Sequence, residues 1–191
     1  MNTAAIILAR GGSKGIPQKN IINFCGEPLL TWTINHCIEG GVDMVYLSSD
    51  SHDILAIGEK YNCHSITRPD DISGDEATSE AGWLHALDVI ERDHGKIDWV
   101  LTPQVTSPLR TADDIRKGLA LAGSGKYDSL FSCSIAEDLL FWENRTGNLE
   151  SVNYNWKNRK RRQDMPKQYI ENGSFYLFRP EVLRKNNNRF G

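Results

Sequence analysis

The stretch Ala4-Ala-Ile-Ile-Leu-Ala9, which ends at a Gly-Gly pair, decides the fold class of this chain. A short run without polar residues is typical of a β-strand that is buried on both faces. After a loop, Pro28 is expected at the first position of a helix, and apolar residues recur at helical spacing from Leu30 to Ile38. The opening therefore predicts a strand, a loop and a helix.

The same alternation continues along the chain. Further strands are expected at Met44–Ser48, Ser65–Ile66 and Trp99–Leu101, and further helices at about 54–61, 83–90, 111–122 and 180–184. Thr111 and Asp114 have the spacing of a helix N-cap. Strands that alternate with helices predict an α/β fold with a Rossmann-like, mainly parallel sheet and helices on both faces.

The pattern changes after about residue 128. Phe131, Cys133 and Ile135 alternate with serines, which predicts a strand with two different faces. Residues 137–168 are polar, basic and weakly periodic, so we expect an irregular or hairpin excursion there. Phe175–Phe178 is expected to return to the main sheet.

Composition narrows the class of protein. A chain of 191 residues with 39% hydrophobic residues predicts a single domain, and a net charge of -3 argues against a general nucleic-acid partner. The first apolar run is too short to span a membrane or serve as a secretion signal, so no membrane partner and a cytoplasmic location are expected. The four cysteines lack CxxC spacing and are expected to be buried free thiols.

The loop after the first strand carries the clearest chemical signal. It reads Arg10-Gly-Gly-Ser-Lys-Gly-Ile-Pro-Gln-Lys-Asn20, with cations at Arg10, Lys14 and Lys19. Ligands of open α/β sheets bind at the carboxyl ends of strands, and glycines allow backbone N–H groups to face an anion. The loop therefore predicts a polyphosphate site, although it matches neither the Walker A nor the GxGxxG pattern. The alternative is a glycine-rich turn with solvated lysines.

Leu8–Pro17 together with Lys19-Asn20 resembles the signature of the acylneuraminate cytidylyltransferase family, the CMP-sialic acid synthetases. Other segments that resemble the family follow in its order: Arg68-Pro69, Gln104–Arg110, Arg161–Asp164 and Glu171–Tyr176. The resemblance runs from residue 4 to the end of the chain. It implies a fold of the nucleotide-diphospho-sugar transferase type, and a nucleotidyltransferase that joins a nonulosonic acid to CMP from CTP and releases pyrophosphate.

The resemblance also implies site residues. Those implied for the nucleotide are Arg10, Gly11, Gly12, Ser13, Lys14, Lys19, Asn20 and Arg68. Those implied for the acid sugar are Gln104, Arg162, Gln163, Asn172 and Tyr176. Those implied in catalysis are Arg162, Lys19 and Arg161, with either Arg161 or Arg162 facing the sugar carboxylate. Arg110 is expected to pair with Asp113 or Asp114.

The family's reaction normally uses a divalent metal, and Mg²⁺ is expected because the ligands are hard oxygens. The family's Asp-x-Asp metal motif corresponds to positions beyond Gly191, so we expect residues 1–191 to be a C-terminally incomplete domain with weak or absent turnover and assign no metal ligand. Asp50 is expected to cap a helix. Residues 137–168 are expected to contribute to the sugar site and to a homodimer.

Several alternatives stay open. The acid sugar could be legionaminic, pseudaminic or a Kdo-type acid in place of a neuraminic acid. The chain could instead be a nucleotide-binding domain without catalysis, or a sugar-transferring enzyme on a similar fold. The basic run Lys157–Arg162 also permits a nuclear-localisation or nucleic-acid patch.

Overall fold

The computed structural model describes residues 1–137 and 139–191. The chain forms two compact units, each considered by itself. Unit 1 comprises Met1–Ser132 and Gly173–Gly191, and unit 2 comprises Cys133–Asn172. The excursion predicted for residues 137–168 lies within unit 2.

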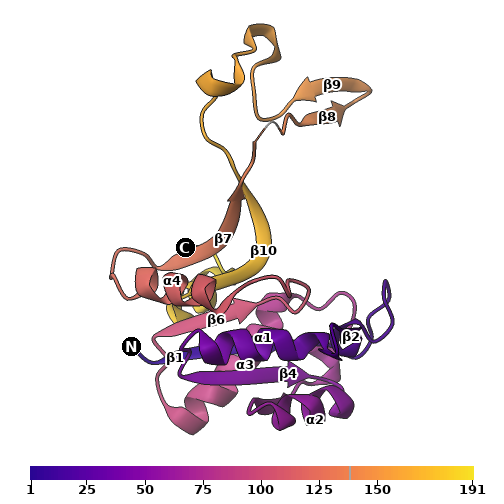
Figure 1. The fold of residues 1–191 in the computed structure, drawn as a ribbon, viewed down its shortest axis with the longest axis vertical. Helices are drawn as coiled ribbons and strands as arrows, with labels where there is room; N and C mark the ends of the chain where they lie inside the picture. Colours follow the sequence, from indigo (N-terminus) through magenta and orange to yellow (C-terminus); the bar gives the residue numbers. More distant parts are fainter. Residues whose placement is uncertain (138) are drawn as a thin grey trace. The chain divides into compact units, whose positions relative to one another are not determined.

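A mainly parallel sheet forms the centre of unit 1 (Figure 1). Among the described residues its strand order is β5-β4-β1-β6-β10-β7. Strand β1 runs parallel to β4 and β6, β5 runs parallel to β4, and β10 is antiparallel to β6. The strands are β1 (Thr3–Leu8), β4 (Met44–Ser49), β5 (His64–Thr67), β6 (Trp99–Pro103), β7 (Ser129–Ile135) and β10 (Tyr169–Phe178). The mainly parallel α/β architecture expected from the sequence is confirmed.

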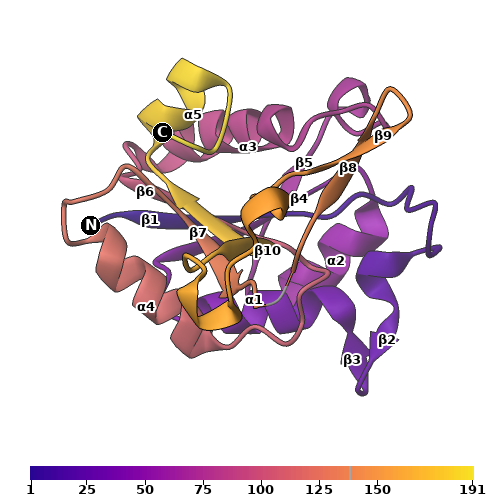
Figure 2. The same ribbon diagram turned by 90° about the horizontal axis from the view of Figure 1, so that it is seen from above.

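Helices cover both faces of this sheet. They are α1 (Leu29–Glu39), α2 (His52–Lys60), α3 (Ser79–His94), α4 (Ala112–Ala122) and α5 (Pro180–Asn186). Figure 2 shows α3 and α5 on one face and α1, α2 and α4 on the other. Short 3-10 turns occupy Lys19–Ile21 and Asp70–Ile72, and the hairpin β2 (Asn23–Phe24) with β3 (Glu27–Pro28) precedes α1. Pro28 is the N-cap of α1 and not, as predicted, its first helical residue, because its ψ of 137° is not helical.

Strand β1 divides the core in two. Ala5, Ile7 and Ala9 belong to the cluster that packs under α1, α2 and α4. Ala4 and Ile6 belong to the cluster under α3 and α5. Successive side chains of a strand point to opposite faces, so an uninterrupted apolar run is what two helix layers require.

Unit 2 contains the hairpin β8 (Trp142–Arg145) and β9 (Asn148–Ser151) and 3-10 turns at Trp156–Asn158 and Arg162–Asp164. The ring of Trp142 packs edge-on against Tyr154, with centroids 5.8 Å apart. Trp142 and Trp156 both stay largely exposed.

The cysteine prediction is half right. All four cysteines are free thiols, and Cys37 and Cys63 are buried. Cys25 and Cys133 are exposed, because Cys25 lies in the turn between β2 and β3 and Cys133 lies on β7. An apolar neighbour in sequence does not bury a side chain in a turn.

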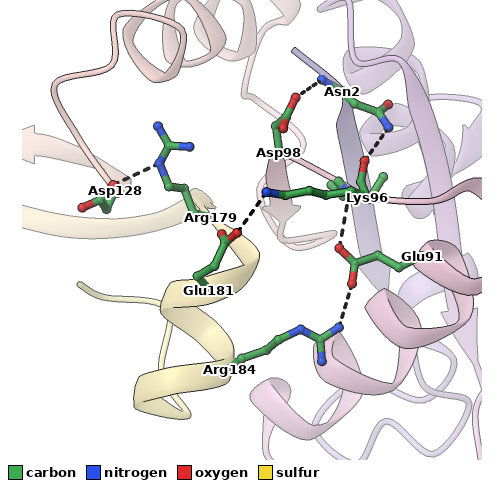
Figure 3. Close-up of polar contacts among 9 residues, drawn as sticks. Asn2, Glu91, Lys96, Asp98, Asp128, Arg179, Glu181 and Arg184 are labelled. Carbon is green, nitrogen blue, oxygen red and sulfur yellow. Dashed lines mark hydrogen bonds and ion pairs between the residues drawn. The ribbon is translucent and has the colours of Figure 1, made fainter.

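Polar side chains hold the amino ends of β1 and β6 together with α5 (Figure 3). The backbone N–H of Asn2 donates to Asp98 Oδ2 over 2.7 Å, and Asn2 Nδ2 donates to the Lys96 carbonyl oxygen over 2.9 Å. Lys96 Nζ lies 3.5 Å from Glu181 Oε1 on α5. The Asp98 carboxylate thus accepts from the backbone just before β1, and the Lys96 charge is paired with Glu181, so these contacts join β1, β6 and α5.

No helix among the described residues is both long and apolar enough to cross a membrane.

The capping box predicted at the start of α4 is present. Thr111 Oγ1 accepts from the Asp114 backbone N–H over 3.3 Å, and Asp114 Oδ2 accepts from the Thr111 backbone N–H over 2.9 Å. We expect Thr111→Ala to lower the free energy of unfolding by about 1 kcal/mol, because a helix donor loses its acceptor. Urea unfolding should show a lower midpoint with an unchanged slope. Thr111→Ser keeps the acceptor and serves as the control; an equal loss in both variants would contradict a capping role.

Candidate functional site

The loop after β1 is fixed from beneath by its neighbours. Its Gly11 backbone N–H donates to Asp50 Oδ1 over 2.9 Å, and Asp50 directly follows β4. The buried Asn20 donates from Nδ2 to the Arg10 carbonyl oxygen over 2.9 Å. Asp50 was expected to cap a helix, but Ser51 is the N-cap of α2 and the Asp50 carboxylate holds the loop. The path of the chain at Arg10 and Gly11 is thus set by protein contacts.

The glycines of this loop differ in what they require. A Cβ at Gly11 would lie 3.1 Å from the Cβ of Ser51, so a larger residue there would require Ser51 to shift by a few tenths of an ångström. Gly12 and Gly15 face open space, and neither has a positive φ. The Ser13 backbone N–H donates to the Gly11 carbonyl oxygen over 3.0 Å, which tightens the turn. That Gly12 and Ser13 bind an anion stays a prediction.

Two of the three predicted cations share one carboxylate. Arg10 Nη1 lies 2.9 Å from Asp75 Oδ1, and Lys14 Nζ forms an ion pair with Asp75 Oδ2. Arg10 also donates to the Gly74 carbonyl oxygen over 3.2 Å. The hydrogen bond from Lys14 holds the pKa of the Asp75 carboxyl below its usual value. Lys19 begins the 3-10 turn and has no ion-pair partner in the described part of the chain.

A pocket of about 210 Å³ opens beside this loop. Its lining residues are Leu8, Arg10, Arg68, Ile72, Ser73, Gly74, Asp75, Ala77, Thr78 and Ser79. It therefore combines the end of β1, the loop after β5 and the start of α3. The two arginines on its wall suit an anionic or hydrogen-bond-accepting ligand, although Arg10 is paired with Asp75, which also lines the pocket.

Arg68 is buried in the wall of this pocket, with 6% of its surface exposed. Its Nε donates to Ser73 Oγ over 3.0 Å, while its two terminal nitrogens donate no hydrogen bond within residues 1–137 and 139–191. Burial lowers the pKa of Arg68, and the nearby Asp50 carboxylate opposes this effect. A Cβ on Gly82 would lie 3.3 Å from Arg68 Nη1, so glycine there leaves room for the guanidinium. Arg68 thus keeps donors for a ligand.

Gln104 follows β6, the parallel neighbour of β1 on the other side from β4. Its side chain is exposed. After β1 the chain continues to β4 on one side of the sheet, and after β6 it continues to strands on the opposite side. The gap between β1 and β6 is therefore a topological switch point, where ligands of such sheets bind. The fold thus brings the loops after β1 and β6 to one edge of the sheet.

Two expectations about nearby residues change with the structure. Arg110 is buried and donates to the carbonyl oxygens of Ser174 and Gln104, so its expected pairing with Asp113 or Asp114 is wrong. The Asp114 carboxylate accepts from Thr111 in the helix cap, and the Asp113 carboxylate pairs with Arg116 and Lys117 of α4. Tyr176 is only 3% exposed, and the guanidinium of Arg189 lies 4.6 Å from its ring centroid. This gives Tyr176 a packing role, and its contact with a sugar stays a prediction.

The remaining candidates lie in unit 2. Arg161 Nε donates to Asp164 Oδ2 over 2.8 Å, and Arg162 Nη2 lies 2.5 Å from Glu137 Oε2. Gln163 is in the 3-10 turn with Arg162, and Asn172 Nδ2 donates to Ser134 Oγ over 3.3 Å. Whether these residues meet Gln104 around one ligand stays a prediction.

No three or more His, Cys, Asp or Glu side chains of residues 1–137 and 139–191 are grouped so that they could hold a metal ion. The described residues therefore do not form a protein-ligated Mg²⁺ site, and Mg²⁺ stays a prediction.

The fold defines an α/β protein with an arginine-lined pocket at the carboxyl edge of its mainly parallel sheet, and sequence comparison gives the family. The chain belongs to the cytidylyltransferase family, whose model matches residues 4–189. N-acylneuraminate cytidylyltransferase A of Danio rerio is 32% identical over 186 residues, which cover 95% of this chain and 42% of that protein. Pseudaminic acid cytidylyltransferase of Campylobacter jejuni is 32% identical over 183 residues, which cover 93% of this chain and 78% of that protein. The chain thus spans less than half of the Danio rerio relative.

Solved structures agree on the fold. CMP:2-keto-3-deoxy-manno-octonic acid synthetase complexed with CTP superposes with a TM-score of 0.75 at 14% identity, covering 98% of this chain and 78% of that one. A 4-diphosphocytidyl-2C-methyl-D-erythritol synthase gives a TM-score of 0.69 at 9% identity, covering 96% and 77%. At these identities the likeness concerns the fold alone.

Sequence reasoning missed the acidic residues of the site. From the sequence, Asp50 is a candidate for a metal ligand that does not match the family motif and can equally cap a helix, and Asp75 is one acidic residue of a polar loop from Arg68 to Ala77. Asp50 directly follows β4, and Asp75 lies in the segment that joins β5 to α3. Their position after the carboxyl ends of parallel strands is the one sequence signal that could have singled them out. Their partners lie 39 or more residues away, and no local spacing indicates them.

Asp75 competes with any bound anion for Arg10 and Lys14. We expect Asp75→Asn to tighten the binding of inorganic tripolyphosphate about fivefold at low salt, since exposed ion pairs are individually weak but two are released. Isothermal titration at two salt concentrations measures this. Asp71→Asn, which makes the same charge change on an exposed residue of the same loop, is the control; equal tightening in both variants would show a general charge effect.

Proposed function

We propose that this protein transfers CMP from CTP to a nonulosonic acid and releases pyrophosphate. Membership of the cytidylyltransferase family and relatives named for N-acylneuraminate and pseudaminic acid support this proposal. The main structural support is the pocket beside the loop after β1. Arg10 and Arg68 line this pocket, and the two terminal nitrogens of Arg68 donate to no described residue.

The nucleotide is proposed to lie along this edge of the sheet. The triphosphate would replace Asp75 as the partner of Arg10 and Lys14, with Lys19 and the backbone at Gly11, Gly12 and Ser13 as further donors, because charge-assisted hydrogen bonds are the strong ones. Arg68 would donate to the ribose or the base from inside the pocket. Asn20 would act indirectly, by holding the Arg10 carbonyl.

The acceptor sugar is proposed to bind over Gln104, whose carboxamide can both donate to and accept from hydroxyl or acylamino groups. Arg161 or Arg162 would face its carboxylate, with Gln163 and Asn172 as neighbours. The anomeric oxygen attacks the α-phosphorus in line, the bond from that phosphorus to the bridging oxygen breaks, and pyrophosphate leaves with the electron pair. The hydroxyl proton passes to solvent. Positioning and charge neutralisation would supply the rate, with Lys19 and the arginines around the transferring group.

Three further parts of the proposal rest on the family. The protein would work with Mg²⁺, in the cytoplasm, and as a homodimer to which unit 2 contributes its exposed rings at Phe141, Trp142 and Trp156. A sialic acid is the first candidate acceptor and pseudaminic acid the second, since the relatives carry both names. A nucleotide-binding domain without catalysis would bind CTP and never form pyrophosphate.

A substrate screen separates these possibilities. CTP, UTP, ATP and GTP are titrated calorimetrically, and pyrophosphate release is then followed with neuraminic, legionaminic, pseudaminic and Kdo-type acids. We expect CTP to bind most tightly and pyrophosphate to form with one or more of the nonulosonic acids. Pyrophosphate formation with a Kdo-type acid alone would show that the acceptor is a Kdo-type acid and not a sialic or pseudaminic acid. CTP binding no tighter than ATP binding would contradict the proposal.

The contribution of the loop cations can be measured separately. Lys14→Ala is expected to weaken CTP binding about tenfold, because it removes a charged hydrogen-bond donor from the phosphates. Lys96→Ala removes the same charge at the opposite, amino edge of the sheet, where Lys96 pairs with Glu181 (Figure 3), and is expected to leave CTP binding unchanged. Equal affinities for the two variants would show that the loop after β1 does not hold the nucleotide.

A further inference from the structure

Arg110 is a buried cation that forms no ion pair with a carboxylate of residues 1–137 and 139–191, although the Asp114 carboxylate is near enough to oppose the lowering of its pKa. It is 6% exposed, at the end of the loop that joins β6 to α4. Nη1 donates to the Ser174 carbonyl oxygen over 2.7 Å and approaches the Gln104 carbonyl oxygen at 3.4 Å, while Nη2 donates to Thr33 Oγ1 over 3.0 Å. Among the described residues, no carboxylate accepts a hydrogen bond from this guanidinium. One side chain therefore joins α1, the β6–α4 loop and β10.

Such an arrangement is costly for stability alone. Burial lowers the pKa of Arg110, and its Nε has no hydrogen-bond partner within the described residues. A buried charge that lacks a counter-ion loses hydration that neutral acceptors restore only in part, and well-packed apolar residues often stabilise such positions better. The four contacts of the guanidinium with the carbonyl oxygens of Gln104 and Ser174 and the hydroxyl oxygens of Ser174 and Thr33 therefore indicate a role beyond stability.

The contacts fix the backbone of Gln104. Its N–H donates to the Ser174 carbonyl oxygen over 3.0 Å, so Ser174 accepts from both Gln104 and Arg110. The Gln104 carbonyl oxygen accepts from the Ser107 backbone N–H over 3.2 Å as well as facing Arg110. The peptide groups on both sides of the Gln104 Cα are thereby tied to β10 and to the guanidinium.

The Gln104 side chain has the opposite character. It is exposed, and its carboxamide forms no hydrogen bond with any residue that the structure describes. The carboxamide lies beside Gly173, where an added Cβ would be 3.8 Å from each of its terminal atoms. A fixed backbone with free donors and an acceptor at the carboxyl end of a strand is preorganised for a ligand.

We propose that Arg110 is a positioning residue that clamps the β6–α4 loop to β10 and so orients Gln104 toward the acceptor sugar. This inference rests on the proposed function, in which Gln104 binds the acid sugar. It separates two parts of the site. Arg10, Lys14 and Arg68 are proposed to hold the nucleotide from the loops after β1 and β5, while Arg110 is proposed to affect the acceptor sugar through Gln104 on the loop after β6.

The test uses Arg110→Met, which keeps length but removes the donors, and Arg110→Lys, which keeps a charge and one donor site. Arg116→Met on the exposed face of α4 is the matched control. We expect Arg110→Met to raise the KM for the acid sugar about tenfold, as expected for losing an oriented hydrogen-bonding group, with CTP affinity within about twofold of the parent protein. Arg110→Lys should recover part of the KM, and Arg116→Met should change neither quantity.

A double-mutant cycle decides whether Arg110 acts through Gln104. If it does, Gln104→Ala and Arg110→Met each raise the KM for the sugar, and their combination raises it no further than Gln104→Ala alone. Full additivity, or an equal loss of CTP affinity, would overturn the proposal. If Arg110→Met does not fold, the same cycle with Arg110→Lys gives the same decision.

Hydrogen exchange tests the clamp without any substrate. The Gln104 and Ser107 amides should exchange at least several-fold faster in the Arg110 variants, while the Ala9 amide, bonded to Ser48 in another part of the sheet, should not change. Unchanged exchange at Gln104 and Ser107 would overturn the clamp. Faster exchange in a protein that shows no reaction with any nonulosonic acid would instead contradict the proposed function and leave the clamp standing.

Discussion

The burial of β1 on both faces is the constraint on which the rest of the structure depends. Its alternating side chains supply both core clusters, and its backbone pairs with β4 on one side and β6 on the other. A strand in this position must end at the same edge as its parallel neighbours, so the loops after β1, β4 and β6 have to share that edge. The Gly11 contact with Asp50 and the exposure of Gln104 follow from this arrangement.

The local parts of the fold could be predicted because they depend on neighbours in sequence. Apolar runs and helical spacing predict helices α1 to α5 and strands β1, β4, β5 and β6, and the Thr111 and Asp114 spacing predicts the capping box, but the short hairpin of β2 and β3 has no such signal in the sequence. Arg110 could not be interpreted in this way. Two acidic residues lie three and four positions after it, but its guanidinium bonds to Ser174, 64 residues away. Arg110 bonds to Ser174 because β10 packs beside the β6–α4 loop, and this long-range packing cannot be read from residues near Arg110 in sequence.

The sequence singles out the cations of the candidate site, Arg10 and Lys14, but it does not single out Asp75, the carboxylate that balances their charge. Arg10 and Lys14 stand out in sequence because they flank glycines, whereas Asp75 is one acidic residue among several in a polar loop. A cluster of like charges that awaits an anion destabilises the protein without one, and a nearby carboxylate offsets this. Because the Asp75 pKa is held low, the pairing is present above the ordinary aspartate pKa and is lost only as the pH falls through the lowered value.

Arg68 and Arg110 show why residue type alone does not assign a role. Both are buried to the same degree and both have a pKa lowered by burial. Arg68 uses only its Nε within the described protein and lines a pocket, so its terminal nitrogens can reach a ligand. Arg110 has no hydrogen-bond partner for its Nε among the described residues and directs its terminal nitrogens to carbonyl and hydroxyl oxygens of the fold. Because a guanidinium has donors at both ends of its planar group, the end that faces the protein determines whether the residue binds a ligand or positions another residue.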